Sequence, residues 1–502
     1  MSIREKLLST VRQLTPSGGR TERVVKSAIW LLSQNAVGRI LQLVTLIILA
    51  RLIGPAEVGL MGIALLALAA VNKFTNIGLN AALIQQAEEN VDEYLNTTWI
   101  LEIGRGVLIA GVLVLAAPLI ASVFNESRAT DVIRVIALSP ILLGLRNPGV
   151  VYFRKNLDFH KQFMYKIGTE LIRAAVTIGY VLVSPTVWAY VVGFIAADLS
   201  QTLLSYVLHG YRPWPRFDTE SAKELVDYGK WITGTSILHF LYSEGDDAVV
   251  GWLVSPAALA FYRYGYRFSN APATELGQVV ASVMFPAFSK IQDDSDTLRK
   301  TFLQSLQMTS FVSFPAAFGI AAVAPTFVRA FLGEDWTLMI IPMQILAFYG
   351  LLSAIGQTFG PLCKALGRPD YVTKLSALRV AILAVLVIPV TSEYGVVGTA
   401  ALVTGVYLFV MMPLDLYIIA TLLEMKVTTI ASEFVYPLAA SALMGAAVYQ
   451  LQSMLAINPI VEFLLLIGAG VVVYALVTLF LDSLFDWGIT YHLRRVVANV
   501  KS

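Results

Sequence analysis

Fourteen apolar segments, each long enough to cross a bilayer as a helix, follow one another along this chain. A spanning helix needs about 20 predominantly apolar residues, and it satisfies its own backbone polar groups where no water can do so. Of the 502 residues, 57% are hydrophobic and 14% are charged, whereas soluble domains are about 25% charged. The chain has too little polar surface to fold in water, so the sequence predicts an all-α integral membrane protein.

The ends of these segments are marked by charged residues or by Pro and Gly. The predicted spans cover residues 27–50, 57–82, 95–124, 131–152, 163–184, 186–208, 229–254, 257–285, 302–324, 338–362, 372–391, 395–422, 429–450 and 459–481. Some connections are as short as Ser184-Pro185 and Ser255-Pro256. Neighbouring spans joined in this way are expected to form helical hairpins.

Lys and Arg are distributed unequally between the two sides of the predicted membrane. Counted over alternating loops, the side that holds the N-terminus carries 24 basic residues and the opposite side carries four. Basic residues are concentrated in the cytoplasmic loops of membrane proteins. We therefore expect a multi-pass protein of the cytoplasmic (plasma) membrane with both chain ends in the cytoplasm.

An internal repeat relates residues 22–60 to residues 223–261 at a constant offset of 201. Leu52-Ile-Gly-Pro-Ala56 aligns with Leu253-Val-Ser-Pro-Ala257, although chance similarity between apolar helices is the competing explanation. The repeat predicts two pseudo-symmetric six-helix lobes, an arrangement that is common in transporters. The expected parts are a cytoplasmic lead (1–26), the first lobe (27–210), an interfacial linker helix (211–228), the second lobe (229–422), transmembrane helices 13 and 14 (429–481) and an amphipathic cytoplasmic tail (482–502).

Several classes of function are disfavoured by the composition. The net charge of +2 gives no reason to expect a nucleic-acid partner. The four histidines are scattered without the spacing of metal ligands, and Cys363 is the single cysteine. The sequence contains neither a nucleophile elbow nor a P-loop. We therefore expect no catalytic residues, no metal and no cofactor, and a protein that is not an enzyme.

Eight of the 36 basic residues lie inside the predicted spans and more than four residues from either end, and those nearer an end are counted with the adjoining loop. A Lys or Arg at the centre of a membrane helix costs about 2.5–3.5 kcal/mol on the insertion scale, so these residues should face protein or a water-filled cavity. Arginine is also well suited to binding phosphate. The candidate substrate-binding residues are Arg39, Lys73, Arg105, Arg146, Arg173, Arg263 and Arg267. The eighth is Arg379.

Embedded carboxylates form a second candidate group in the seventh span. Glu244, Asp246 and Asp247 are the candidate ion-coupling or gating residues. Asp247 and Arg263 lie at similar depths on either side of a hairpin turn, so we expect them to pair across it.

Two of the predicted cations have an acidic neighbour on their own helix. Glu102 precedes Arg105 by three residues, and Glu170 precedes Arg173 by three residues. Side chains at this spacing lie on one helical face. For these two arginines a structural ion pair is therefore the competing interpretation.

The two-lobe, fourteen-span plan resembles the multidrug/oligosaccharidyl-lipid/polysaccharide (MOP) exporter superfamily, and within it the polysaccharide transporter family. The residues that carry the resemblance are Leu52-Ile-Gly-Pro-Ala-Glu-Val-Gly59, Asp247 with Leu253-Val-Ser-Pro256, and Lys364 to Arg368-Pro-Asp-Tyr371. The usual second-half turn of that family has Gly before Pro, and here this residue is Ser255.

The resemblance implies a flippase that moves a lipid-linked (polyprenyl or dolichyl pyrophosphate) oligosaccharide across the membrane by alternating access, for polysaccharide or lipopolysaccharide export. The implied partners are the lipid-linked oligosaccharide, membrane lipids, H+ or Na+ as a coupling ion, and the polysaccharide synthesis machinery. Three alternatives stay open. They are a cation- or drug-coupled antiporter of the same superfamily, a peptidoglycan-precursor flippase, and a membrane enzyme such as a polymerase or ligase, which the short outer loops disfavour.

Overall fold

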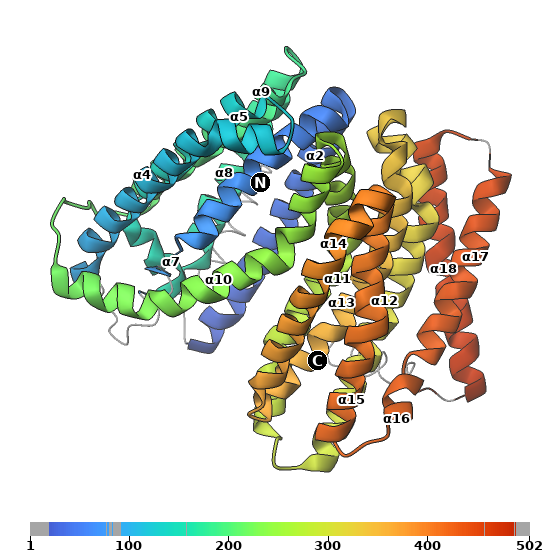
Figure 1. The fold of residues 1–502 in the computed structure, drawn as a ribbon. Helices are drawn as coiled ribbons and strands as arrows, with labels where there is room; N and C mark the ends of the chain where they lie inside the picture. The colour runs from blue at the N-terminus through green and yellow to red at the C-terminus, as the bar shows by residue number, and fades with distance from the viewer. Residues whose placement is uncertain are drawn as a thin grey trace, which may run out of the picture. The chain divides into compact units, whose positions relative to one another are not determined.

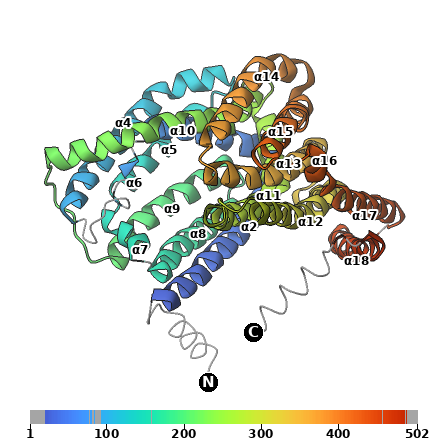
Figure 2. The same ribbon diagram turned by 90° about the horizontal axis from the view of Figure 1, so that it is seen from below.

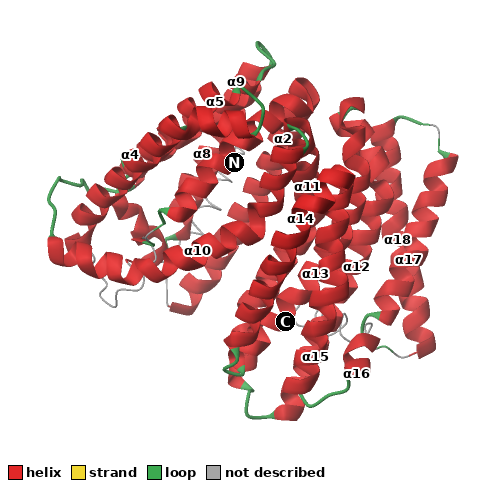
Figure 3. Ribbon diagram, in the orientation of Figure 1, coloured by secondary structure: helices red, strands yellow, loops and turns green. Residues whose placement is uncertain are grey.

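The computed structural model describes residues 20–76, 78–79, 83, 92–156, 158–455, 457–485 and 487. Every regular element among these residues is a helix, as the sequence predicts (Figure 3). Most of the predicted cytoplasmic lead and most of the predicted amphipathic tail lie outside the described residues.

The chain begins with helices that are joined mostly by short turns (Figure 1). They are α2 (Arg20–Phe74), α4 (Asp92–Val123), α5 (Ala129–Ile136), α6 (Leu138–Gly144), η1 (Pro148–Val151), α7 (Tyr152–Lys155), α8 (Phe159–Val181), α9 (Val187–Leu208) and α10 (Thr219–Leu253). The helices that follow are α11 (Pro256–Lys290), α12 (Ser295–Phe327), η2 (Val328–Leu332), η3 (Glu334–Met339), α13 (Ile340–Ala365), α14 (Pro369–Val406), η4 (Tyr407–Met411), α15 (Met412–Leu422), α16 (Val427–Ser432), α17 (Val435–Met454) and α18 (Pro459–Phe485).

Eight stretches of the described chain are long and apolar enough to cross a membrane. Two of them, Ser33–Phe74 and Pro369–Leu422, are of double length. Each of these two is divided by a glycine in the left-handed region, Gly54 with φ of 72° and Gly395 with φ of 59°. Glycine adopts this conformation without the steric cost that a Cβ imposes. With these two divisions counted, and with the more polar α8, α10, α11 and the α5–α6 pair added, the described helices follow the order of the fourteen predicted spans.

The described chain forms two compact units. The first contains residues up to Ala248 together with 255–257, and the second contains residues 249–254 and everything from Ala258 onward. Within the first unit α2 packs against α8, α8 against α9, and α4 against α5 and α6. Within the second unit α12 packs against α13, α17 and α18, and Figure 2 shows α17 and α18 side by side.

Helix α10 makes contacts with α2 inside the first unit. Asn76 Nδ2 donates a hydrogen bond to Ser236 Oγ over 3.2 Å, and the rings of Phe74 and Phe240 lie 5.8 Å apart. The predicted linker helix at 211–228 consists of a non-helical segment up to Asp218 followed by the first turns of α10. The predicted lobe boundaries and the pseudo-symmetry of the lobes stay predictions.

Two glycines bring α4 and α6 into backbone contact. A Cβ at Gly106 would lie 2.3 Å from the carbonyl oxygen of Pro140, and a Cβ at Gly144 would lie 2.6 Å from that of Glu102. Small residues at helix interfaces allow such close approach in membranes, where burial of apolar surface does not drive association. This contact fixes the end of α6, after which the chain continues into η1 and α7.

The outer turns of the first unit are tied together by ion pairs. Arg128 contacts the carboxylates of both Glu57 and Glu126, and the backbone N–H of Val187 donates to the second Glu57 oxygen over 2.9 Å. These residues come from the turns between α2's two halves, between α4 and α5, and between α8 and α9. We call this group the outer clasp.

Candidate functional site

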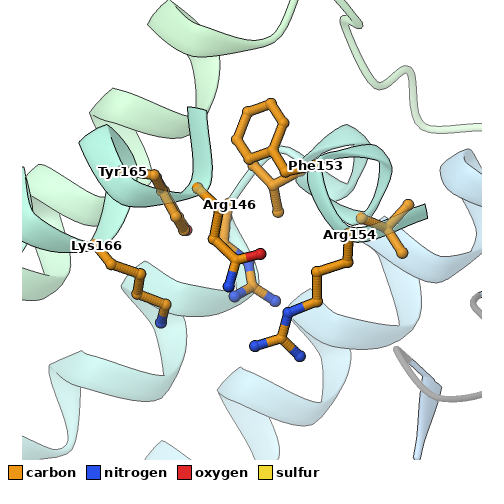
Figure 4. A pocket seen from close by; sticks show the side chains of 8 residues that line it. Arg146, Phe153, Arg154, Tyr165 and Lys166 are labelled. Atoms are coloured by element: carbon orange, nitrogen blue, oxygen red, sulfur yellow. The ribbon is translucent and has the colours of Figure 1, made fainter. Parts of the chain in front are cut away.

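A pocket rich in cations lies in the first unit, where the chain passes from α6 through η1 and α7 into α8. The cationic pocket has a volume of about 190 Å³. Its lining includes Arg146, Phe153, Arg154, Gln162, Tyr165 and Lys166. Figure 4 shows the charged ends of Arg146, Arg154 and Lys166 directed into the same space.

The three cations of the pocket form no ion pair among the described residues, although Glu170, one turn further along α8, lies within electrostatic range of Lys166. Lys166 lies within electrostatic range of Arg146 and Arg154, yet no ion pair joins any of the three to a carboxylate in the part of the chain that the structure describes. Like charges held together repel one another, and burial strengthens that repulsion. The arrangement therefore favours an anionic ligand, and arginine with lysine is a common combination for phosphate.

The backbone that carries Arg146 and Arg154 is fixed by Asn147. This side chain is fully buried, and its Oδ1 caps the short η1 helix by accepting from the N–H of Gly149 over 2.9 Å. The backbone N–H of Asn147 donates to Ser205 Oγ on α9 over 2.9 Å. Pro148 at the first helical position suits such a start. The turn between α6 and α7 is thus a defined structure that holds the two arginines in place.

A polar face of α8 continues from the pocket. Lys166, Glu170 and Arg173 follow at intervals of four and three residues, so they share one face of the helix. Arg173 pairs with Glu170 at 3.6 Å, and its guanidinium lies 5.5 Å from the ring centre of Phe194 on α9. The buried carboxylate of Asp198 is within electrostatic range of this face. The ion pair proposed as the competing interpretation for Arg173 is therefore present.

Arg105 has a structural position at the end of a helix. Its Nε donates to the carbonyl of Thr75 over 2.9 Å, and its Nη2 donates to the carbonyl of Asn72 over 3.1 Å. It also pairs with Glu102 at 3.3 Å. Carbonyls at a helix C-terminus lack intrahelical partners, and a cation there satisfies them. This geometry favours the structural interpretation of Arg105.

The other predicted site residues are spread over three helices. Arg39 and Lys73 lie half-buried on α2. The carboxylates Glu244, Asp246 and Asp247 lie on α10, and Arg263 and Arg267 lie on α11. Asp247 belongs to the first unit and Arg263 to the second, so the predicted pairing between them stays a prediction.

Sequence reasoning assigned Arg146 to the candidate site and missed Arg154 and Lys166 as members of it. Both were counted among the basic residues of a cytoplasmic loop, because they fall at the ends of the apolar segments. The sequence signal for Lys166 is its position on the same helical face as Glu170 and Arg173. No comparable periodic signal exists for Arg154, which lies in a four-residue helix.

The second unit contains a buried arginine in a different environment. Arg379 on α14 is 3% exposed. Its Nη2 donates to the hydroxyl of Tyr349 over 2.8 Å, and its guanidinium lies 5.1 and 5.2 Å from the ring centres of Tyr349 and Tyr407. Cations over aromatic faces are stabilised by the ring quadrupole. Arg379 is thus enclosed by side chains of its own unit.

Residues 48–341 match the family model described as "Polysaccharide biosynthesis protein". The chain belongs to the polysaccharide biosynthesis protein family. Among relatives of this polysaccharide biosynthesis protein is the lipopolysaccharide biosynthesis protein WzxC of Escherichia coli (strain K12), which is 27% identical over 361 residues, or 71% of this chain and 73% of that protein. The probable low-salt glycan biosynthesis flippase Agl15 of Haloferax volcanii is 23% identical over 468 residues, or 91% of this chain and 96% of that protein.

Solved structures show the fold to which this polysaccharide biosynthesis protein is similar. The lipid II flippase MurJ in an inward closed conformation superposes with a TM-score of 0.73 at 15% identity, covering 92% of this chain and 99% of that one. An inward-facing multidrug resistance MATE transporter of the MOP superfamily superposes with a TM-score of 0.59 at 16% identity, covering 76% and 94%. The protein is therefore a multi-pass protein of the cytoplasmic membrane with the fold of MOP-superfamily transporters.

Proposed function

We propose that this protein is a flippase that translocates an oligosaccharide linked to polyprenyl or dolichyl pyrophosphate across the cytoplasmic membrane. Family membership, a relative named as a probable glycan biosynthesis flippase, and the fold shared with a lipid II flippase support this proposal. The protein acts by alternating access, as a transporter without enzymatic activity and without a cofactor. The glycan then enters polysaccharide or lipopolysaccharide export, together with the synthesis machinery.

The cationic pocket is the observation that carries the proposal. Arg146, Arg154 and Lys166 converge there without a carboxylate partner among the described residues. A pyrophosphate group carries negative charge on both phosphates, so it matches this surplus. A carrier of cationic drugs would need the opposite balance of charge at its binding site.

The predicted residues in the membrane supply the remaining steps of the proposed cycle. The two lobes move relative to each other around the substrate while the lipid tail stays in the bilayer. Arg39, Arg263 and Arg267 neutralise the pyrophosphate inside the membrane. The carboxylates Glu244, Asp246 and Asp247 hold these arginines when substrate is absent, or bind a coupling ion such as H+ or Na+.

The test is translocation of a fluorescent polyprenyl-pyrophosphate oligosaccharide in proteoliposomes. Wild type is compared with the double variant Arg263→Ala, Arg267→Ala and with a control pair from the predicted outer side, Arg134→Ala with Arg329→Ala. The proposal expects transport by wild type and by the control pair. In the Arg263→Ala, Arg267→Ala variant it expects transport to fall at least tenfold, because each charge-assisted hydrogen bond contributes about 1.5–3 kcal/mol.

Two results would contradict the proposal. If wild type inserts correctly but moves none of the lipid-linked glycan, the flippase function is wrong. If the same vesicles move an organic cation against a proton gradient, the antiporter alternative replaces it. In that case the arginines within the spans are structural ion-pair partners.

A further inference from the structure

The segment that joins α9 to α10 is held tightly against the ends of other helices in the first unit. We call residues 209–218 the strap. The N–H of Trp214 and the hydroxyl of Tyr211 both donate to Asn96 Oδ1 on α4, over 2.8 and 2.9 Å. The N–H of Asp218 donates to Thr97 Oγ1 over 3.1 Å. The strap therefore has a fixed position on α4, although it forms no helix or strand.

The strap also contacts the turn that carries the pocket arginines. Asn147, which follows Arg146, donates through Nδ2 to the carbonyl of Tyr211 over 2.7 Å. Phe153, which lines the pocket and precedes Arg154, has its ring centre 5.9 Å from that of His209. The residue next to each pocket arginine thus contacts the strap.

Gly149 allows this contact to form. A Cβ at Gly149 would lie 2.3 Å from His209 Nδ1 and 3.0 Å from Tyr211 Cβ. Real Cβ atoms do not approach other atoms so closely. A side chain at this position would force the His209 ring, or the strap that carries it, to shift, and it would leave every charge of the pocket unchanged.

The size and place of the pocket indicate which part of a ligand it takes. Its volume of about 190 Å³ is smaller than the ~300–1,000 Å³ of sites for drug-sized ligands. It is formed by the turn with the basic residues that the positive-inside rule assigns to the cytoplasm. Leu145 and Met164, which adjoin Arg146 and Tyr165 in sequence, are 38% and 47% exposed. A small anionic group with an attached apolar chain fits these features.

We propose that the cationic pocket binds the phosphate-bearing headgroup of a membrane lipid at the cytoplasmic surface, and that its occupancy is coupled to docking of the strap. The proposal rests on the proposed function, of which it names the first binding step. The docked strap holds Arg146 and Arg154 in position for the headgroup. By reciprocity, a bound headgroup must stabilise the docked strap by the same free energy. Helix α10 begins at Thr219, directly after the strap. Headgroup binding that stabilises the docked strap therefore also stabilises the position of the start of α10.

The experiment measures headgroup affinity and hydrogen exchange of the strap on the full-length protein in nanodiscs. The probes are a polyprenyl diphosphate, inorganic pyrophosphate and the anionic lipid phosphatidylglycerol. The pocket variant is Arg146→Gln with Lys166→Gln, and the strap variants are Gly149→Ala and Tyr211→Phe. The control is Arg368→Gln with Lys374→Gln in the second unit. If Gly149→Ala does not fold, Tyr211→Phe still removes a strap hydrogen bond without touching the pocket.

We expect the polyprenyl diphosphate to slow exchange at residues 209–218 of wild type, and not of the pocket variant. Each strap variant should weaken its binding, by roughly threefold for Tyr211→Phe and tenfold or more for Gly149→Ala, as loss of a hydrogen bond or displacement of the strap implies. If phosphatidylglycerol slows exchange of the strap equally, the pocket accepts the headgroup of any anionic lipid. Protection by inorganic pyrophosphate alone would refute the need for a lipid chain.

The proposal is overturned if the strap exchanges at the same rate with and without the diphosphate, or if the pocket variant binds as wild type does. Such a result would leave the flippase function intact when wild type still translocates the glycan in proteoliposomes. Conversely, headgroup binding with strap protection but without translocation would contradict the proposed function and leave this inference standing.

Discussion

Two basic turns, one in each unit, differ in how their cations are paired. In the first unit Arg146, Arg154 and Lys166 line a pocket without a carboxylate partner among the described residues. In the second unit Arg368 and Lys374 both contact Asp370, at 3.1 and 2.9 Å. One carboxylate within ion-pair distance thus distinguishes the turn at 368–374 from the cationic pocket. The number of basic residues in a turn therefore says little about binding until their partners are known.

Two arginines on membrane helices show a similar contrast. Arg379 in the second unit is enclosed by Tyr349 and Tyr407 and is 3% exposed. Arg173 in the first unit has a side chain 24% exposed and keeps Glu170 as a partner at 3.6 Å. The guanidinium of Arg379 is thus closed off within the second unit, whereas that of Arg173 keeps part of its exposure.

The largest effect is expected when the charges of the two turns are removed in parallel. Loss of Arg146 and Lys166 removes charge-assisted hydrogen bonds of about 1.5–3 kcal/mol each. The variant Arg146→Gln with Lys166→Gln should therefore bind the polyprenyl diphosphate on the order of 100-fold more weakly than wild type. Arg368→Gln with Lys374→Gln should change binding by less than about twofold, because these side chains are already paired. Titration in nanodiscs measures the diphosphate affinity of both variants. Equal losses of affinity would show that the two turns do not differ in binding.

A smaller effect is expected when the pocket is given a carboxylate of its own. Gln162 lines the pocket and is 4% exposed, so Gln162→Glu introduces the kind of partner that Asp370 supplies in the second unit. Competition with the bound phosphate should weaken binding by about tenfold. The matched change Gln162→Met keeps the volume without a charge and should have little effect. Unchanged diphosphate affinity in Gln162→Glu would mean that pairing with a carboxylate does not explain the difference between the two turns.

The sequence identified the all-helical membrane fold, the order of the spans and the turn at Gly54, because hydropathy and glycine positions are local properties of the chain. It placed Arg146 among the candidates for the same reason. The shared face of α8 points to Lys166, but the membership of Arg154 could not be derived, because it depends on Asn147 bending the chain between α6 and α7 and on the strap packing behind that bend. Such tertiary hydrogen bonds leave no periodic trace in the sequence.

Stability should respond to loss of the tyrosine hydroxyl that encloses Arg379. Tyr349→Phe keeps the ring but removes the hydroxyl that accepts from the buried guanidinium of Arg379, which costs about 1–3 kcal/mol. Thermal unfolding of the purified protein should begin at a lower temperature, while diphosphate affinity of the first-unit pocket should stay the same. An equally large loss of affinity would show that the cation of the second unit is not only structural.

The smallest expected effect is that of pH on the strap. Burial lowers the pKa of His209 below its ordinary value, with Lys161 and Arg212 acting in the same direction and Asp92 and Asp158 opposing them. The neutral ring accepts from the N–H of Tyr211 over 3.2 Å. A histidine with a lowered pKa contributes stability above the unfolded pKa of about 6.5, and that contribution is lost as the pH falls through the folded value. The protection factors for hydrogen exchange at residues 209–218, which correct for the slower intrinsic exchange at lower pH, should therefore fall below about pH 6.5, and less so in His209→Gln.

The outer clasp has a practical consequence for anyone who labels this protein. Outer turns are the usual places for epitope tags and fluorescent reporters, because loop tips tolerate insertions. In the first unit three such turns meet at Glu57, through Arg128 and the N–H of Val187. A tag placed in any one of them would disturb the other two. The turn between α17 and α18 has no part in the clasp and is the safer place for a reporter.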